Sequence, residues 1–370
     1  MSDVIRADHV GSLLRPQSLL DARRAHEEGR IATEQLRTAE DQAILHALEL
    51  QRQAGIGVYT DGEFRRTSWV SGLPEVLEGV RQTGARRMPP AAWKGVGETE
   101  ANAELPITSL AITARLGVKR RFTGEEAGFL KANAPGPWKV TMPSPTIQLN
   151  MFDPGSTEAV YPERQALLDD LVAIYRDEVD ALVEDGADYI QLDSLRYTQV
   201  IAGFAPNGEA MSDPDEIIGQ TIAADNAVLE RARAKGVTTG VHICRGNHRS
   251  AWVMSGGYDS IAERLLNEVQ TDRFLLEYDD ERSGGFEPLR FTPKGKIVVL
   301  GLVTTKVGQL EDAEALRRRV DEAARYVPLE QLALSPQCGF ASTFKGNLLT
   351  EDDEKRKLEL VAETARRVWG

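Results

Sequence analysis

The stretch YPERQALLDDLVAIYRDEVDALVEDGADYIQLDS, residues 161–194, contains two structural patterns in succession. Residues 161–186 repeat apolar side chains at helical spacing and end at a glycine, which is typical of an amphipathic helix. Residues 188–194, DYIQLDS, form a short apolar run with the length of a buried strand. A helix that leads directly into a buried strand indicates a parallel sheet with crossover helices.

The same alternation continues on both sides of this stretch. Further helices are predicted at 32–55, 213–236, 257–269, 311–326 and 351–369. Short runs rich in Val, Ile, Leu and Tyr predict strands at 6–12, 57–63, 138–144, 188–194, 238–244, 273–279, 296–303 and 331–337. Eight strands, most of them followed by helices, predict an α/β fold of the (β/α)8 TIM-barrel type, whose chemistry lies at the carboxyl ends of the strands.

One region fits this scheme poorly. Residues 80–135 contain a PP pair, several glycines and the alternating run ITSLAITARL. We expect an inserted hairpin or lid there, beside the mouth of the barrel. No Ser/Gly-rich linker or low-complexity run divides the chain, so residues 1–370 are expected to form a single catalytic domain.

Composition excludes several classes of function. The chain has 44 basic and 57 acidic residues and a net charge of −13, which makes nucleic acid a poor partner. The N-terminus lacks the apolar core of a signal peptide, and no apolar segment is long enough to span a bilayer, so we expect a cytoplasmic protein without a membrane partner. Two cysteines cannot form a disulfide framework; in a reducing compartment they are buried, reactive or metal-bound.

The segment GVHICRGNH, residues 240–248, places His242 and Cys244 two positions apart, on the same face of a predicted strand. Glu277 ends the next strand and Cys338 follows the eighth, so three strand ends bring zinc-type ligands to one region. The alternative is that both cysteines are small buried hydrophobes and the histidine is a satisfied strand-end residue. Spacing alone leaves both interpretations open.

A wider set of motifs extends over nearly the whole chain: HVGSLLRP (9–16), TDGEFRR (60–66), QLDSLR (191–196), HICRGN (242–247), LEYD (276–279) and SPQCGF (335–340). In this combination and order they resemble the cobalamin-independent methionine synthase family, specifically its catalytic C-terminal barrel and the short single-barrel members. The resemblance implies a zinc-dependent methyltransferase of the 5-methyltetrahydropteroyltriglutamate–homocysteine type. Such an enzyme moves a methyl group from a methylated folate or related donor to the thiol of homocysteine and forms methionine.

The resemblance also implies roles for individual residues. The implied zinc ligands are His242, Cys244, Glu277 and Cys338. Glu63 and Asp193 would hold the ammonium of homocysteine by charge-assisted hydrogen bonds, and Ser12 would meet its carboxylate through the backbone. Without the resemblance, Glu63 could merely pair with Arg65 or Arg66, and Asp193 could cap the following helix.

Two departures from the family concern the methyl donor. A chain of 370 residues leaves no room for the additional N-terminal barrel that helps the long enzymes to hold polyglutamylated folate. Asn150 also falls where those enzymes stack a tryptophan on the pterin, so the donor stays open between a folate, a related compound and delivery by a partner protein. Lys306 falls where a loop histidine is proposed as proton donor; it could bind an anionic donor, act as the acid, or be an exposed solvated lysine.

Three alternatives to methionine synthesis remain. The first is a zinc-dependent alkyltransferase acting on coenzyme M or another small thiol, similar to epoxyalkane:coenzyme M transferases. The second is a barrel similar to uroporphyrinogen decarboxylase, which does not need the His/Cys/Glu/Cys set. The third is a binding protein that holds zinc or a thiol without turnover.

Overall fold

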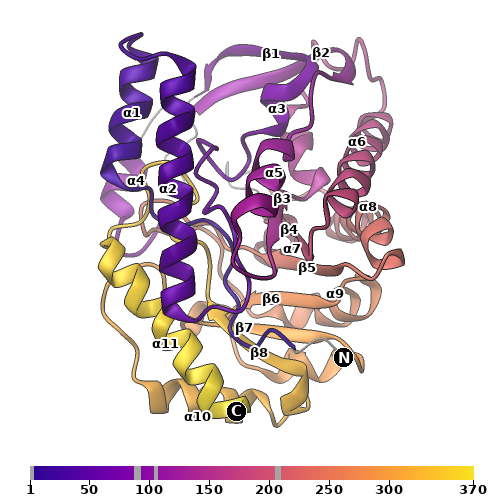
Figure 1. Ribbon diagram of the computed structural model, residues 1–370. Helices are drawn as coiled ribbons and strands as arrows, with labels where there is room; N and C mark the ends of the chain where they lie inside the picture. Colours follow the sequence, from indigo (N-terminus) through magenta and orange to yellow (C-terminus); the bar gives the residue numbers. More distant parts are fainter. Residues whose placement is uncertain (1–3, 87–92, 104–106, 205–209) are drawn as a thin grey trace.

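The protein is described by a computed structural model that covers residues 4–86, 93–103, 107–204 and 210–370 (Figure 1). It is an α/β fold centred on a six-stranded parallel sheet in the order β3-β4-β5-β6-β7-β8. The strands are β3 (Lys139–Pro143), β4 (Tyr189–Ser194), β5 (Thr238–Ile243), β6 (Arg273–Glu277), β7 (Ile297–Val303) and β8 (Leu332–Pro336). Six of the predicted strands are thereby confirmed, and each pairs with the next one along the chain, as crossover connections require.

Helices pack around this sheet. The predicted ones are confirmed with small shifts at their ends, except that the segment predicted as a helix at 257–269 is a 3-10 turn followed by a helix that begins only at Ala262. The helices outside the inserted region are α1 (Gln17–Glu27), α2 (Thr33–Ala54), α6 (Arg164–Asp185), α7 (Arg196–Ala202), α8 (Pro214–Ala234), α9 (Ala262–Glu268), α10 (Ala313–Ala323) and α11 (Glu351–Trp369). Short 3-10 turns join them at η1 (Pro145–Met151), η2 (Tyr258–Ser260), η3 (Glu281–Ser283), η4 (Glu287–Phe291) and η5 (Leu329–Gln331). None of the helices in the described ranges is long and apolar enough to cross a membrane.

The first two predicted strands, 6–12 and 57–63, are not strands in the structure. Each segment is reduced to a single parallel bridge: Ala7 pairs with β8, and Tyr59 pairs with the residue just before β3. The two segments also touch each other, because the N–H of Gly57 donates to the carbonyl of Ala7 at 3.0 Å. They therefore lie between the two outer strands of the sheet.

Backbone conformation explains why these segments do not continue as strands. Gly11, Gly62 and Glu63 have φ values of +147°, +69° and +60°, which interrupt the β conformation. At Gly11 a Cβ atom would stand 2.6 Å from the Thr141 side chain, so only glycine permits this close approach. The apolar runs therefore bend into loops where they approach the mouth of the sheet.

The predicted insertion, 80–135, contains a separate antiparallel pair, β1 (Leu77–Arg86) and β2 (Ile107–Val118), which lies across the top of the molecule in Figure 1. It also contains more helix than predicted: α4 (Glu98–Ala103) lies between the two strands and α5 (Gly124–Asn133) follows them, while the short α3 (Leu73–Val76) precedes the insertion. Residues 87–92 and 104–106 of this insertion are outside the described residues.

One described part of the insertion contacts the loop after β5. Lys94 and Trp252 form an antiparallel bridge, in which each backbone N–H donates to the other's carbonyl at 2.8 and 3.0 Å. The insertion is thus attached by backbone hydrogen bonds to the loop that leaves the strand carrying His242 and Cys244.

A chain of buried polar groups crosses the interior of the parallel sheet. The Asp8 carboxylate pairs with Lys139 Nζ at 2.8 Å and with Arg273 Nε at 3.2 Å. Lys139 also donates to Gln191 Oε1 at 2.8 Å, and Gln191 Nε2 donates to Asp193 Oδ1 at 2.8 Å. This chain links four separate segments and fixes the side chain of Asp193 at the end of β4.

Candidate functional site

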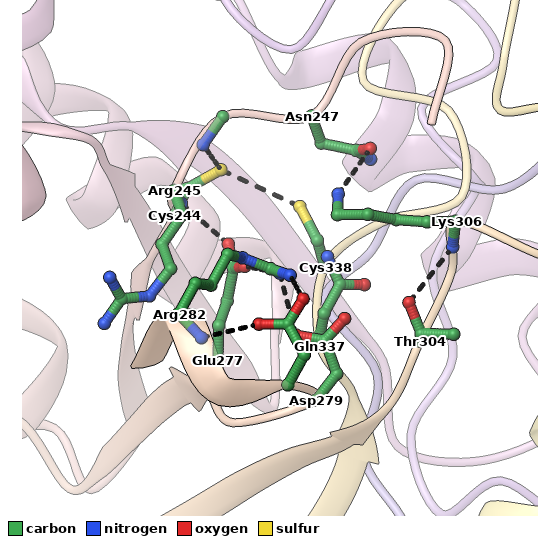
Figure 2. A network of polar contacts seen from close by, with 12 residues as sticks. Cys244, Arg245, Asn247, Glu277, Asp279, Arg282, Thr304, Lys306, Gln337 and Cys338 are labelled. Atoms are coloured by element: carbon green, nitrogen blue, oxygen red, sulfur yellow. Dashed lines mark hydrogen bonds and ion pairs between the residues drawn. The ribbon is translucent and has the colours of Figure 1, made fainter. Parts of the chain in front are cut away.

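The four predicted metal ligands converge at the carboxyl ends of three strands. His242 lies in the last residues of β5 and Cys244 directly follows that strand, β6 ends with Glu277, and Cys338 stands two residues beyond β8. Figure 2 shows Cys244, Glu277 and Cys338. One ligand atom from each of the four lies within 4.8 Å of all the others. His242, Glu277 and Cys338 are buried and Cys244 is partly buried. Among the described residues, this is the group arranged to hold a metal ion.

The geometry of the donor atoms fits zinc. Cys244 Sγ and Cys338 Sγ are 3.7 Å apart, and two thiolates bound at about 2.3 Å to a tetrahedral zinc lie roughly 3.8 Å apart. His242 Nδ1 is 3.2 Å from the carbonyl of Leu275 and donates to it, while Nε2 is buried and has no hydrogen-bond partner within the described chain. A metal-binding histidine is oriented in the same way, with one nitrogen held by a carbonyl and the other free for the ion.

The surroundings of the two cysteines shift the pKa values of their thiols in opposite directions. The hydrogen bond with Cys244 outweighs burial and, with His242 nearby, lowers the pKa of the Cys338 thiol to about 5. The N–H of Gly246 lies 3.3 Å from Cys244 Sγ and donates to it. The same hydrogen bond, together with burial, raises the pKa of the Cys244 thiol. Because zinc binds the deprotonated form of cysteine, Cys338 is the thiol that these surroundings prepare for metal binding.

Glu277 is held by groups that the sequence analysis did not single out. The backbone N–H of Arg245 donates to Glu277 Oε1 at 2.7 Å, and Arg282 Nη2 pairs with Oε2 at 3.0 Å. Burial opposes ionisation of Glu277, but Arg282 and Lys306 outweigh it and hold the pKa of the carboxyl below its ordinary value. The signal that could have revealed Arg282 is its position in DDER, residues 279–282, where one cation follows a run of acids directly after this ligand.

The two carboxylates predicted to bind the substrate, Asp193 and Glu63, are both buried. Asp193 is the register partner of His242 across β4 and β5. Glu63 Oε1 accepts a hydrogen bond from the Thr141 hydroxyl at 2.7 Å, and its buried Oε2 has no partner among the residues described. Burial, together with the nearby Glu63, raises the pKa of Asp193 to about 7. Two buried carboxylates that repel each other form a site that a cation would stabilise.

The arginines next to Glu63 have other carboxylate partners. Arg66 Nε donates to Glu126 Oε1 at 2.7 Å, whereas its Nη1 is 3.9 Å from Glu63 Oε1. Arg65 turns outward to Asp41. The alternative was that Glu63 merely pairs with Arg65 or Arg66. The distance from Glu63 to Arg66 is long for an ion pair, and Arg65 pairs with a different carboxylate.

Asp193 does not cap the helix that follows it, contrary to the second alternative. The N-cap of α7 is Leu195, which has no side-chain capping hydrogen bond. The Oδ1 atom of Asp193 accepts from Gln191 instead.

Ser12 packs against the loop that carries Cys338. A Cβ atom on Gly339 would stand 2.0 Å from Ser12 Oγ, and the N–H of Phe340 donates to the Ser12 carbonyl at 2.9 Å. The first segment of the chain is thereby joined to the last metal-ligand loop, on the same side as the four ligands.

Lys306 lies beside Cys338 in Figure 2 and points toward Asn247. It is 6% exposed, and its Nζ donates to Asn247 Oδ1 at 3.2 Å. The alternative that Lys306 is an exposed solvated lysine is therefore wrong. Its charge is located at the metal-ligand cluster.

Asn150, at the predicted donor side, is exposed near the end of η1. Its Oδ1 accepts a hydrogen bond from Arg196 Nη2 at 3.0 Å. This position carries an amide next to a guanidinium, which offers hydrogen bonds and charge to a ligand where the long enzymes would offer an aromatic ring.

Comparison with known proteins identifies the family of this chain. The family model described as "Cobalamin-independent synthase, Catalytic domain" matches residues 150–351, more than half of the chain. The uncharacterized protein YxjH of Bacillus subtilis is 39% identical, over 98% of this chain and 94% of its own length.

Two solved structures have similar folds. A putative vitamin-B12-independent methionine synthase from Listeria monocytogenes has a TM-score of 0.75 at 29% identity, covering 99% of this chain and 98% of its own. A B12-independent methionine synthase from Shewanella in complex with selenomethionine has the same TM-score and coverages at 20% identity. The predicted family is confirmed: the chain belongs to the cobalamin-independent synthase catalytic-domain family and is a methyltransferase.

Proposed function

We propose that this protein is a zinc-dependent methyltransferase that transfers a methyl group from a methylated folate or related donor to the thiol of homocysteine, forming methionine. The observation that carries the proposal is the convergence of His242, Cys244, Glu277 and Cys338, with two thiols at zinc-binding separation. Selenomethionine, held by the Shewanella protein, is methionine with selenium in place of sulfur, and so resembles the proposed product. A screen of methyl donors with homocysteine and purified protein, following methionine formation, tests the proposal directly.

Each part of the site has a role in this reaction. Zinc bound to the four ligands would supply Lewis-acid stabilisation of the substrate thiolate, the nucleophilic form of a thiol. Glu63 and Asp193 would bind the ammonium of homocysteine and orient its sulfur toward the cluster. Lys306, buried beside Cys338, would bind the anionic part of the donor or provide the proton that the leaving amine requires.

The two carboxylates proposed to bind the ammonium of homocysteine lead to a prediction about Asp193. Asp193→Asn keeps size and hydrogen-bonding capacity but removes a charge, so it should weaken homocysteine binding by roughly 1.5 to 3 kcal/mol, the range for a charged hydrogen bond. Zinc content should stay unchanged, because Asp193 is not a ligand. Homocysteine binding can be followed by the thiolate charge-transfer band of a cobalt-substituted site.

The same titration distinguishes the proposal from the coenzyme M alternative. Two carboxylates near the far end of the acceptor attract an ammonium and repel a sulfonate, so homocysteine should produce the band at far lower concentration than coenzyme M or mercaptopropionate. Unchanged homocysteine affinity in the Asp193→Asn variant, or tighter binding of coenzyme M, would replace methionine synthesis with that alternative. A cobalt spectrum that no thiol alters would indicate a non-catalytic metal site.

The donor side leads to a second prediction. Because Asn150 and Arg196 offer an amide and a positive charge instead of a stacking ring, we propose that the donor is bound by charge and hydrogen bonds. Methyltetrahydrofolate with one glutamate should then reach a kcat/KM at least equal to that of the long polyglutamate form. A strong preference for the long tail in steady-state kinetics would contradict this, and absence of turnover with either form would indicate a different donor or delivery by a partner.

We further propose that the chain folds as one (β/α)8 barrel domain with an insertion at about 80–135. The supporting contacts are the parallel bridges of Ala7 to β8 and of Tyr59 to the start of β3, together with the Gly57–Ala7 hydrogen bond. In this interpretation the two bent N-terminal segments occupy the first two strand positions of the barrel.

A further inference from the structure

Arg66 is bound by a carboxylate that comes from the inserted region. Glu126, on α5, binds both sides of the guanidinium: Arg66 Nε donates to Oε1 at 2.7 Å, and Nη2 donates to Oε2 at 2.5 Å. Nη2 also donates to the Thr141 carbonyl at 2.6 Å. The side chains of Arg66 and Glu126 are each 6% exposed. Two parallel charge-assisted hydrogen bonds in a buried place fix the guanidinium in one orientation.

In this orientation Arg66 lies beside Glu63 without a hydrogen bond between them. Its Nη1 is 3.9 Å from Glu63 Oε1 and donates instead to the Thr141 hydroxyl at 3.4 Å. That hydroxyl donates to Glu63 Oε1 at 2.7 Å. The second oxygen, Oε2, is buried and has no hydrogen-bond partner within the described ranges. One side of the Glu63 carboxylate is therefore left for a group from outside the chain.

The backbone of Glu63 is also held in an uncommon conformation. Its φ is +60°, in the left-handed region that residues with a side chain rarely adopt. Its N–H donates to Asp61 Oδ1 at 2.9 Å, and its carbonyl accepts from Arg15 Nη2 at 2.7 Å. Strained backbone that the surroundings hold in place is concentrated at binding sites. Together with the free oxygen, it indicates that the Glu63 carboxylate is directed at a ligand.

A competing arrangement is close in space. Without Glu126, the Arg66 guanidinium can close the gap of 3.9 Å and form a full ion pair with Glu63. Its positive charge would then occupy the place of a ligand ammonium, and the buried Glu63 carboxylate would already be neutralised. The partner of Arg66 therefore decides whether Glu63 is open or paired.

We infer that Glu126 is a positioning residue: by binding Arg66, it keeps Glu63 available to the ammonium of the acceptor thiol. The inference rests on the proposed function, in which Glu63 binds that ammonium. It gives the inserted region a part in selecting the acceptor. A thiol that carries an ammonium gains from an open Glu63, whereas a thiol without one does not.

The test compares homocysteine with 4-mercaptobutyrate, which is the same molecule without the amino group. Binding of each is followed by the thiolate band of the cobalt-substituted protein. Burial raises the pKa of Glu126 to about 7 although Arg66 lowers it, so the titrations are made at about pH 8, where this carboxylate is ionised. The measured quantity is the preference for homocysteine over 4-mercaptobutyrate, because general damage to the site weakens both thiols.

Glu126→Gln keeps the shape of the side chain but removes its charge. It should lower the preference for homocysteine about tenfold, with zinc content unchanged, because the loss of one charged hydrogen bond affects only the thiol with an ammonium. Glu125→Gln is the matched control. Glu125 precedes Glu126 on α5 and pairs with Arg37 at 2.5 Å, with its side chain 45% exposed, so this variant should match the wild type. Equal preferences in the two variants would overturn the inference.

A second substitution separates positioning from loss of structure. Adding Arg66→Met to Glu126→Gln removes the cation that would occupy Glu63, so the wild-type preference should be restored. A preference that stays low in the double variant contradicts the inference.

If Glu126→Gln does not fold, Glu126→Asp takes its place. Aspartate keeps the charge but is one methylene shorter, so it cannot hold both sides of the guanidinium while Arg66 stays on Thr141. The preference for homocysteine should then fall severalfold. An unchanged preference in the aspartate variant would overturn the inference.

Failure of the proposed function would be recognised in the wild-type protein itself. Its cobalt spectrum would not respond to homocysteine, or homocysteine would bind no better than 4-mercaptobutyrate. In contrast, failure of the inference alone would leave the wild-type preference intact and would appear only in the variants.

Discussion

Cys244→Ser and Cys338→Ser are each expected to leave the purified protein with less than about a tenth of its zinc and without methyl transfer. Serine is nearly the same size as cysteine, but its hydroxyl is neutral at physiological pH and is a poor ligand for zinc. The remaining histidine, carboxylate and single thiolate lose both a soft donor and a negative charge. Elemental analysis after gel filtration gives the metal content, and methionine formation gives the activity.

Asp193→Asn is the control for these serine variants, because Asp193 lies in the same mouth and pairs in register with His242 without belonging to the ligand set. It should retain full zinc. Full zinc content in both serine variants would rule out the proposed metal centre. If Asp193→Asn also lost its zinc, the loss in the serine variants could be explained by general disruption of the site and not by removal of a ligand.

Asp8→Asn is expected to lower the free energy of unfolding by about 3 to 5 kcal/mol, the range for removing one partner of a buried ion pair. Asp8 is fully buried between Lys139 and Arg273, whose side chains are 0% and 4% exposed. The asparagine keeps the shape but leaves both cations without their counter-charge. Urea denaturation followed by circular dichroism measures the change.

Two further variants show whether the effect belongs to the buried pair. Adding Lys139→Met to Asp8→Asn removes one of the stranded cations and should recover part of the lost stability. Asp321→Asn breaks an exposed pair with Arg317, whose side chains are 55% and 47% exposed, and should change stability by less than about 0.5 kcal/mol. A loss for Asp8→Asn as small as that for Asp321→Asn would contradict the assigned role of the cluster.

The sequence was sufficient for the part of the fold in which local pattern and tertiary environment agree. Strands such as β4 are buried along their whole length, so their apolar runs and flanking helices are unambiguous. The segments 6–12 and 57–63 have similar composition, but Gly11, Gly62 and Glu63 take positive φ values that no apolar pattern reveals. The helix α5 was missed because its apolar residues lack a strong helical period.

The convergence of His242, Cys244, Glu277 and Cys338 could be predicted for a physical reason: a parallel sheet brings successive strand ends to one edge, so position along the chain implies proximity. The substrate-binding roles proposed for Glu63, Asp193 and Ser12 needed the family resemblance, because a carboxylate or a serine at a strand end has many roles. Arg282 could not be assigned, because three neighbouring acids compete for it and only the folded loop shows that Glu277 is among its partners.

The backbone bridge between Lys94 and Trp252 bears on how this family diversifies. Inserted segments accumulate substitutions and length changes faster than strands, since few buried contacts constrain them. Here the insertion is hydrogen-bonded to the residue whose ring lies against Arg282, the partner of Glu277. A substitution near Lys94 can therefore shift the ring that lies against the partner of Glu277, while His242, Cys244, Glu277 and Cys338 themselves are inherited unchanged. Relatives with identical His/Cys/Glu/Cys sets but different insertions are expected to differ in their choice of thiol.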